Sequence, residues 1–300
     1  MAGSGLTLSE IQEQEAQAHS TRVKLYEALE QRLQMPVVAY FASFDAGFDA
    51  MIEDQDAGVL QDVLQARGIK GDFALMISSP GGFPESAERF VSVCRSFADK
   101  GQFIALVPGL AKSAATMICF GADQIIMSES SELGPVDPQV PFMDGNQVNW
   151  LPAHTLVKTY DELFQEAVKT KGNMEPYIQQ LKGFSAAKIK FYEDSIALSE
   201  IISIKHLQCS MMKGRGQSYV KNKIKTFIDP AKTRSHGRPI GATDAARCGL
   251  NIRHVSVHDP LWTDVYALYA RLDNFVRTRA FKVLETRQSS LTWGAGRGRV

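Results

Sequence analysis

The sequence predicts an α/β fold with a mostly parallel sheet, flanking helices and helical extensions at both termini. Apolar runs of strand length, such as MPVVAYFAS (35–43) and FALMISS (73–79), alternate with segments of helical period and are joined by short connections. This alternation is typical of parallel strands joined by right-handed crossovers. The chain has 300 residues, of which 44% are hydrophobic and 22% charged, so it can bury a large core.

Predicted strands and helices alternate in the first half of the chain. The N-terminal extension, residues 1–34, is expected to hold a polar helix that starts at a capping box from Ser9 to Gln12. The helix at 84–100 has a clear period, because its apolar residues recur every three or four positions and Pro84 suits the first turn. By the same signals we predict strands at 35–43, 73–79, 102–108 and 124–128, a helix at 54–67 and a short helix from about Ser113.

The second half of the chain is predicted to be mainly helical. LGPVDPQVPFMDGN (133–146) is rich in proline and glycine and is expected to be a loop, whereas 152–169 has the spacing of a strongly amphipathic helix. The strongly basic stretch 213–238 is interpreted as a surface loop. The remaining predictions are a helix at 186–212, a short helix and a last strand within 237–255, and a long helix from about 260 to 287.

These elements predict one catalytic domain over residues 35–256, with a C-terminal helix within 257–288 and a disordered tail at 289–300. The net charge is zero, so no overall field favours nucleic acid or an anionic membrane. The four cysteines are far apart and form no CxxC pair, which argues against a zinc site or disulfide framework and favours buried thiols in a reducing compartment. The N-terminus lacks the pattern of a signal peptide, and no apolar run is long enough to span a bilayer. We therefore expect a cytoplasmic protein with no intrinsic membrane anchor.

Two predicted turns carry residues suited to chemistry, and each follows a predicted parallel strand. SSPGG (78–82) has two consecutive glycines, whose N–H groups can approach a ligand closely. GLAKSAAT (109–116) places Ser113 where a strand turns into a helix, with the N–H of Ala114 in the first helical turn. The carboxyl ends of parallel strands meet at one edge of the sheet, so these turns are expected to lie together. A serine between two sets of backbone donors suits acyl transfer. Judged alone, Ser113 also fits a plain helix N-cap.

SPGG, GLAKSAAT, ADQIIMS and ELGPVDPQ, in this order, resemble the Clp-type serine peptidases, a group that includes Clp protease subunits and signal peptide peptidase A. The nearest branch is the SDH or "serine dehydrogenase proteinase" family, which shares the LGPVDPQ loop. The resemblance covers about residues 35–255 and implies a Clp/crotonase-type fold. The chain has no GxGxxG motif, so the "dehydrogenase" in that label has no support here.

The resemblance also implies roles for residues in the two turns. The family nucleophile falls on Ser113, and the backbone oxyanion donors fall on Gly82 and Ala114, with Gly81 shaping the turn. The implied reaction is peptide-bond hydrolysis through an acyl-enzyme. It needs no metal and no organic cofactor.

The base that activates the serine stays open between two readings. The family positions of the base and its orienting group fall on Asp137 and His236, which have exchanged residue type relative to Clp subunits. Ser113, Asp137 and His236 together supply the chemistry of a triad. Signal peptide peptidase A instead uses a serine–lysine pair. Lys112 adjoins the serine and is expected to diverge from it, so Lys158 on the amphipathic helix is the candidate lysine.

The expected partners are a polypeptide substrate and further copies of the chain, because family members form rings or other closed oligomers. A separate unfoldase or a membrane partner is compatible with the sequence, and nucleic acid is not expected. Two other classes stay open. One is an acyl-CoA enzyme of the crotonase group, which shares the fold and the oxyanion amides but does not need a serine at this turn. The other is a scaffold that has kept the fold and lost the reaction.

Overall fold

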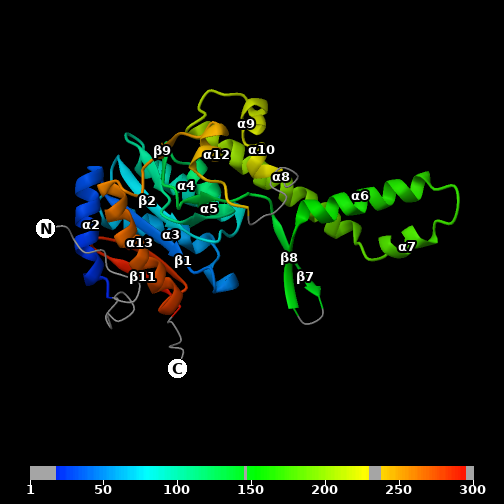
Figure 1. The fold of residues 1–300 in the computed structure, drawn as a ribbon, viewed down its shortest axis with the longest axis horizontal. Helices are drawn as coiled ribbons and strands as arrows, with labels where there is room; N and C mark the ends of the chain where they lie inside the picture. Colours follow the sequence, from blue (N-terminus) through cyan, green and yellow to red (C-terminus); the bar gives the residue numbers. More distant parts are fainter. Residues whose placement is uncertain (1–17, 145–146, 230–237, 295–300) are drawn as a thin grey trace.

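A computed structural model of the chain describes residues 18–144, 147–229 and 238–294. Within these residues the central sheet has seven strands in the order β11-β10-β1-β2-β3-β5-β9 (Figure 1). In this sheet β1, β2, β3, β5 and β9 are parallel to one another. Strand β10 pairs antiparallel with β1, and β11 pairs antiparallel with β10. The predicted α/β fold with a mostly parallel sheet is therefore confirmed. The strands are β1 (Val37–Ala42), β2 (Phe73–Ser78), β3 (Phe103–Leu106), β5 (Gln124–Met127), β9 (Ile252–His254), β10 (Lys282–Thr286) and β11 (Ser290–Trp293).

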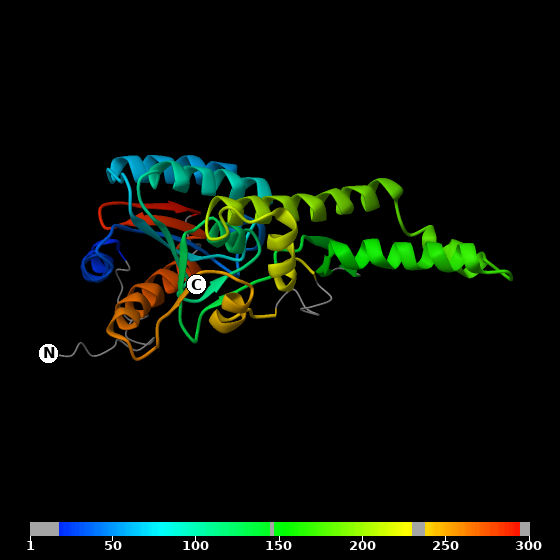
Figure 2. The ribbon, with the colours of Figure 1, turned by 90° about the horizontal axis from the view of Figure 1, so that it is seen from above.

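Helices cover both faces of this sheet, which explains why the strands are apolar at every position rather than at alternate ones. Along β1, Val38 and Tyr40 face one core, while Val37, Ala39 and Phe41 face the other. Figure 2 shows the two helical layers on opposite sides of the strands. The first layer contains α3 (Asp54–Ala66), α4 (Pro84–Phe97) and α5 (Ala114–Phe120), and the second contains α2 (Ser20–Leu33) and α13 (Pro260–Thr278).

A helical arm extends away from the sheet (Figures 1 and 2). It consists of α6 (Ala153–Lys169), α7 (Glu175–Leu181) and the first half of α8 (Ala186–Cys209). The predicted amphipathic helix exists, but Ala153 is its buried residue, and its apolar stripe meets the neighbouring arm segments, as in the Tyr160–Phe184 ring contact. The second half of α8 returns to the core. Its buried residues there are Ser199, Ile202, Ser203, Ile204, His206 and Leu207.

Two segments predicted to be loops contain regular structure. The stretch 133–146 contributes to β6 (Glu132–Leu133), which pairs with β4 (Leu110–Ala111), and to the hairpin of β7 (Gln139–Asp144) and β8 (Gln147–Pro152). The loop prediction for 213–238 is wrong at α9 (Gln217–Lys223) and α10 (Lys225–Ile228). Lysines between the apolar residues hid a helical stripe, whose members are fully buried. These are Val220, Ile224 and Phe227.

The C-terminal prediction is also wrong in part. The long helix ends at Thr278 instead of about 287, and strands β10 and β11 follow, so the tail expected to be disordered from 289 is a strand up to Trp293. Local sequence missed β10 because two of its buried residues, Lys282 and Glu285, are charged. Cys94, Cys119 and Cys248 are buried as expected, whereas Cys209 is exposed. The predicted capping box from Ser9 to Gln12 and the end of the tail (295–300) lie outside the described residues.

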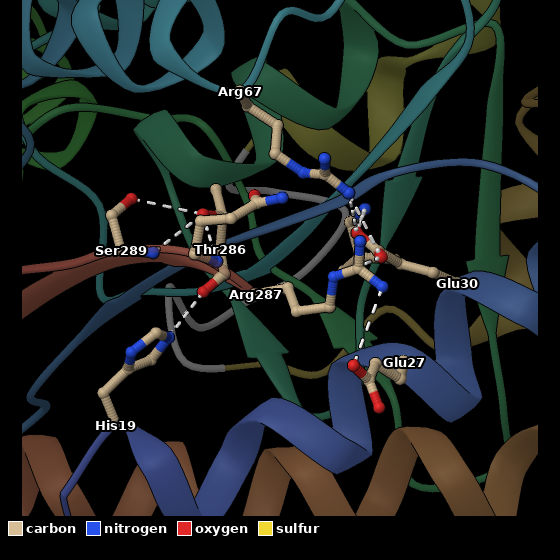
Figure 3. Close-up of polar contacts among 9 residues, drawn as sticks. His19, Glu27, Glu30, Arg67, Thr286, Arg287 and Ser289 are labelled. Carbon is tan, nitrogen blue, oxygen red and sulfur yellow. Dashed lines mark hydrogen bonds and ion pairs between the residues drawn. The ribbon is translucent and has the colours of Figure 1, made fainter.

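Helix α2 and the β10–β11 hairpin hold each other through polar contacts (Figure 3). The Glu30 carboxylate lies between two guanidinium groups, 3.1 Å from Arg67 Nη2 and 3.5 Å from Arg287 Nε. His19 Nε2 lies 2.7 Å from the carbonyl oxygen of Thr286. These contacts join the N-terminal helix to strands from the C-terminal end of the chain.

Candidate active site

The two turns singled out in the sequence lie side by side at the carboxyl ends of β2 and β3. Ser79 N–H donates to the carbonyl of Leu110 at 3.0 Å, and Lys112 N–H donates to the carbonyl of Ser79 at 3.0 Å. These bonds form a parallel bridge between Ser79 and Ala111. The chain therefore carries SSPGG and GLAKSAAT to the same edge of the sheet, as their positions after parallel strands predict.

Ser113 has an unusual backbone conformation at the start of α5. Its φ is 49° and its ψ is −118°, a left-handed region that non-glycine residues seldom occupy. Such strain costs on the order of 1–3 kcal/mol and concentrates at functional sites. The side chain is half-buried and makes no capping hydrogen bond. Within the described residues, the hydroxyl has no hydrogen-bond partner, so a capping function does not explain this serine.

Both glycines of the double-glycine turn are required by close approach. Gly81 has a φ of 108°, and a Cβ built on it would lie 2.7 Å from the Ser113 Cβ and 3.1 Å from the Ala114 nitrogen. A Cβ on Gly82 would lie 2.3 Å from the backbone nitrogen of Ile52. No side chain fits at either position. The turn is thus held between Ser113 on one side and Ile52 on the other.

The amides around Ser113 divide into those that are engaged and those that are available. Gly81 N–H donates to the hydroxyl of Ser79 at 3.1 Å, so it only shapes the turn. Across the described parts of the chain, the N–H groups of Gly82 and Ala114 donate to no acceptor. Ser113 directly precedes Ala114, and its Cβ lies against Gly81, the residue before Gly82. An unengaged pair of N–H donors next to a serine is the arrangement that stabilises a developing oxyanion.

Thr116, which sequence reasoning did not single out, joins α5 to the LGPVDPQ loop. Its hydroxyl accepts from Gly134 N–H at 3.0 Å and lies 2.7 Å from the carbonyl oxygen of Ala111. The residue is fully buried. Its place in the KSAAT motif, three residues after Ser113, was the available signal.

Asp137 is buried, with 5% of its surface exposed, and lies on the loop that Thr116 anchors. It accepts a hydrogen bond from Gln139 Nε2 at 3.3 Å. A small hollow beside it is lined by Ser199 and Glu200 of α8 and by Ile228 of α10. His236, the other member of the predicted triad, lies outside the described residues.

The candidate lysine lies in the arm. Lys158 is on α6 with 63% of its side chain exposed, and its Nζ is 3.6 Å from Glu162. Lys112 Nζ is 2.5 Å from Glu132, so its ammonium is paired with a carboxylate. His154 lies in the first turn of α6, next to Ala153, whose N–H donates to the carbonyl of Pro138 at 2.9 Å. This bond places the start of α6, where His154 stands, next to the Asp137 loop.

Across the ranges that the structure describes, no three His, Cys, Asp or Glu side chains are grouped as metal ligands. Helices in the same ranges are each too short or too polar to cross a bilayer.

The sheet order, the covering helices and the paired turns define an α/β fold with a mostly parallel sheet. Residues 50–172 match the family model of ClpP-like SDH-type serine proteinases. This segment includes SPGG, Ser113 and the LGPVDPQ loop. The sequence resemblance to the SDH family of Clp-type serine peptidases is therefore confirmed.

Two relatives come from Methanocaldococcus jannaschii, and both are named as uncharacterized. MJ0137 is 28% identical over 179 residues, which cover 59% of this chain and 52% of the relative. MJ1495 is 33% identical over 66 residues, or 22% of each chain. The chain thus spans about half or less of the length of these relatives.

A solved structure of a mutant of a membrane-bound stomatin-specific protease also matches. It is 18% identical with a TM-score of 0.28, and the match covers 42% of this chain and 63% of the other. At this TM-score the match supports no inference about the chain.

Proposed function

We propose that this chain is a serine peptidase that hydrolyses peptide bonds through an acyl-enzyme. The observation that carries the proposal is Ser113, strained at φ 49° and packed against the double-glycine turn, where the amides of Gly82 and Ala114 donate to no acceptor among the described residues. Its oxygen attacks the carbonyl carbon, its proton passes to a base, and the carbonyl oxygen takes the negative charge between the two amides. Collapse expels the amine, which takes up the proton. Water then releases the acyl group.

The base is proposed to be His236, with Asp137 as the orienting carboxylate. Burial of Asp137 on a loop anchored to α5 supports the carboxylate's part in this assignment. Lys158 stays as the alternative. A lysine base needs a desolvated site that favours its neutral form. The Lys158 side chain is largely exposed and paired with Glu162, so we favour this candidate less than His236. His154 is a further candidate for the base and is included in the test.

The substrate is proposed to be a polypeptide, and the active form a closed homo-oligomer. The arm supports assembly, because it carries large apolar side chains in solvent. Phe191 and Val168 are 64% and 68% exposed. A separate unfoldase remains compatible with this proposal.

Cleavage of casein and of a chromogenic peptide by purified variants tests the proposal. We expect Ser113→Ala to lose activity by about 10³-fold or more and to keep its circular dichroism spectrum. A comparable loss in His236→Ala, with Lys158→Ala active, supports the triad. Full activity in His236→Ala with loss in Lys158→Ala would replace it by a serine–lysine pair, and loss in His154→Ala alone would move the base there. Unchanged cleavage by Ser113→Ala would refute the proposal.

A further inference from the structure

A buried lysine on strand β10, near the C-terminus, makes hydrogen bonds to residues 51–56 in the N-terminal part of the chain. Lys282 is 1% exposed, and its Nζ donates to the carbonyl of Met51 at 3.1 Å, to Glu53 Oε1 at 2.7 Å and to Asp56 Oδ1 at 3.0 Å. An ammonium group has three N–H donors, so each acceptor can take one. Asp56 is itself fixed, because it accepts from the Tyr40 hydroxyl at 2.9 Å. The segment 51–56 therefore has its position set by one buried cation.

Ile52, in this segment, is hydrogen-bonded to the double-glycine turn. Ile52 lies between two residues that Lys282 binds. Its N–H donates to the carbonyl of Gly81 at 2.9 Å, and its own carbonyl accepts from Phe83 N–H at 3.0 Å. Ile52 and Gly82 form a parallel bridge through these bonds. A shift of residues 51–53 would therefore carry the turn with it.

The direction of the Gly82 amide follows from the planarity of its peptide. The carbonyl of Gly81 and the N–H of Gly82 belong to the same trans peptide unit and point to opposite sides of the chain. Because Ile52 N–H holds the carbonyl, the N–H of Gly82 is directed away from Ile52. The tight fit at Gly82, where a Cβ would lie 2.3 Å from Ile52 nitrogen, leaves little room to rotate.

We propose that Lys282 is a positioning residue for the oxyanion hole, acting through Ile52 on the N–H of Gly82. This inference rests on the proposed peptidase function. The β10–β11 hairpin is thus part of the catalytic architecture, although it follows Ser113 by more than 160 residues. The backbone of Lys282 is fixed by its pairing with Ala42 in β1 and with Trp293 in β11.

The same strand offers a matched control on the opposite face of the sheet. Glu285 is 0% exposed and accepts from Arg22 Nε at 2.7 Å, so it belongs to an equally buried ion pair. Its partner is on α2, in the layer that does not contain the double-glycine turn. Loss of either pair is expected to destabilise the fold. Only loss of the Lys282 contacts should disturb the oxyanion hole.

The test measures the labelling of Ser113 by a fluorophosphonate probe, with kinact and KI determined separately. The full chain is compared as wild type, Lys282→Met and Glu285→Gln, after each is shown to be folded by circular dichroism. We expect Lys282→Met to lower kinact by about 10- to 100-fold, because a misdirected oxyanion donor weakens the transition state, and to leave KI within about threefold. Glu285→Gln should keep kinact within about threefold of the wild type, since it touches no part of the site.

A milder variant keeps the test decisive if Lys282→Met does not fold. Glu53→Ser removes the contact to Lys282 but preserves a good N-cap for α3, and it should lower kinact by about 3- to 10-fold. Wild-type kinact in folded Lys282→Met, or in Glu53→Ser where Lys282→Met does not fold, would overturn this inference alone. An equal fall of kinact in Glu285→Gln would do the same. Absence of labelling at Ser113 in the wild type would overturn the proposed function and this inference with it.

Discussion

At the scale of single residues, the central feature is a serine held in a conformation that suits glycine better. The contacts on either side explain how the strain persists. Gly81 packs against the Ser113 Cβ, and α5 begins at the next residue. The surrounding structure thus fixes φ at 49° and presents the hydroxyl instead of letting it cap the helix.

Strain at this position predicts an unusual order of stability. We expect Ser113→Gly to be more stable than Ser113→Ala by about 1 kcal/mol, because glycine accepts a positive φ that alanine resists. Both variants lack the hydroxyl, so both should be inactive. Urea unfolding of the two proteins measures the difference. An alanine variant equal to or more stable than the glycine variant would show that the backbone at 113 is not strained.

The residues that form the candidate site were predictable where they belong to a short, local motif. Ser113 and the two glycines stand in short motifs that follow strands, so the sequence alone could bring them together. Lys282 stands in no such motif, and for Thr116 the motif marks the residue but not its partner. The partners of Lys282 are more than 220 residues away, and the Thr116 hydroxyl matters only because Gly134 folds back onto it.

At the scale of elements, α8 packs against α5, the helix that begins directly after Ser113. His206 Nδ1 donates to the carbonyl of Met117 on α5 at 2.8 Å, and Ser210 Oγ lies 2.5 Å from the carbonyl oxygen of Phe120. Burial lowers the pKa of His206 to about 4, because its charged form would be desolvated. The contact between α5 and α8 therefore requires a neutral imidazole.

This contact predicts a stability that depends on pH. The unfolded chain has an ordinary histidine pKa of about 6.5, so it binds the proton more readily than the folded chain between about pH 6.5 and 4. Stability is complete above that window and falls as the pH drops through it. We expect the wild type to lose about 2 kcal/mol more than His206→Asn between pH 7.5 and 5, measured by urea unfolding. Asparagine keeps a donor for Met117 and does not titrate. Equal losses in the two proteins would contradict the assignment.

Helices and strands were predicted correctly where their apolar residues recur at one regular spacing. They were missed where charged residues interrupt that spacing. The parallel strands and α4 follow from apolar runs and spacing. In α9 and α10, lysines flank a buried stripe, and in β10 two charged residues are buried because they meet opposite charges on α3 and α2. Those pairings exist only in the folded chain, so no local pattern revealed them.

At the scale of the whole molecule, the candidate site lies at one edge of a sheet that helices cover on both faces. An arm of α6, α7 and the first half of α8 projects away from this sheet (Figure 1). The arm exposes apolar residues that a monomer leaves in water. The largest exposed ones are Phe164, Val168, Met174, Ile178 and Phe191. Exposed side chains of this kind, gathered on one extension, are typical of an interface.

We expect the wild type to form a closed oligomer through this arm. Changing Val168 and Phe191 together to serine should reduce the assembled mass, as measured by sedimentation equilibrium, because about 1–3 kcal/mol of apolar burial is lost per side chain at each contact. Leu291→Ser is the control, since Leu291 is 43% exposed but lies on β11 away from the arm. A monomeric wild type, or an unchanged mass in the arm variant, would contradict the proposed assembly.

The claim on which the account depends is that the Ser113 hydroxyl is an activated nucleophile. Its most direct test is mass spectrometry of the full chain after incubation with a fluorophosphonate, followed by peptide mapping. The account predicts a single adduct on Ser113 that is absent from folded Ser113→Ala. A folded wild type that takes no adduct, or one that takes it at another residue, would contradict it.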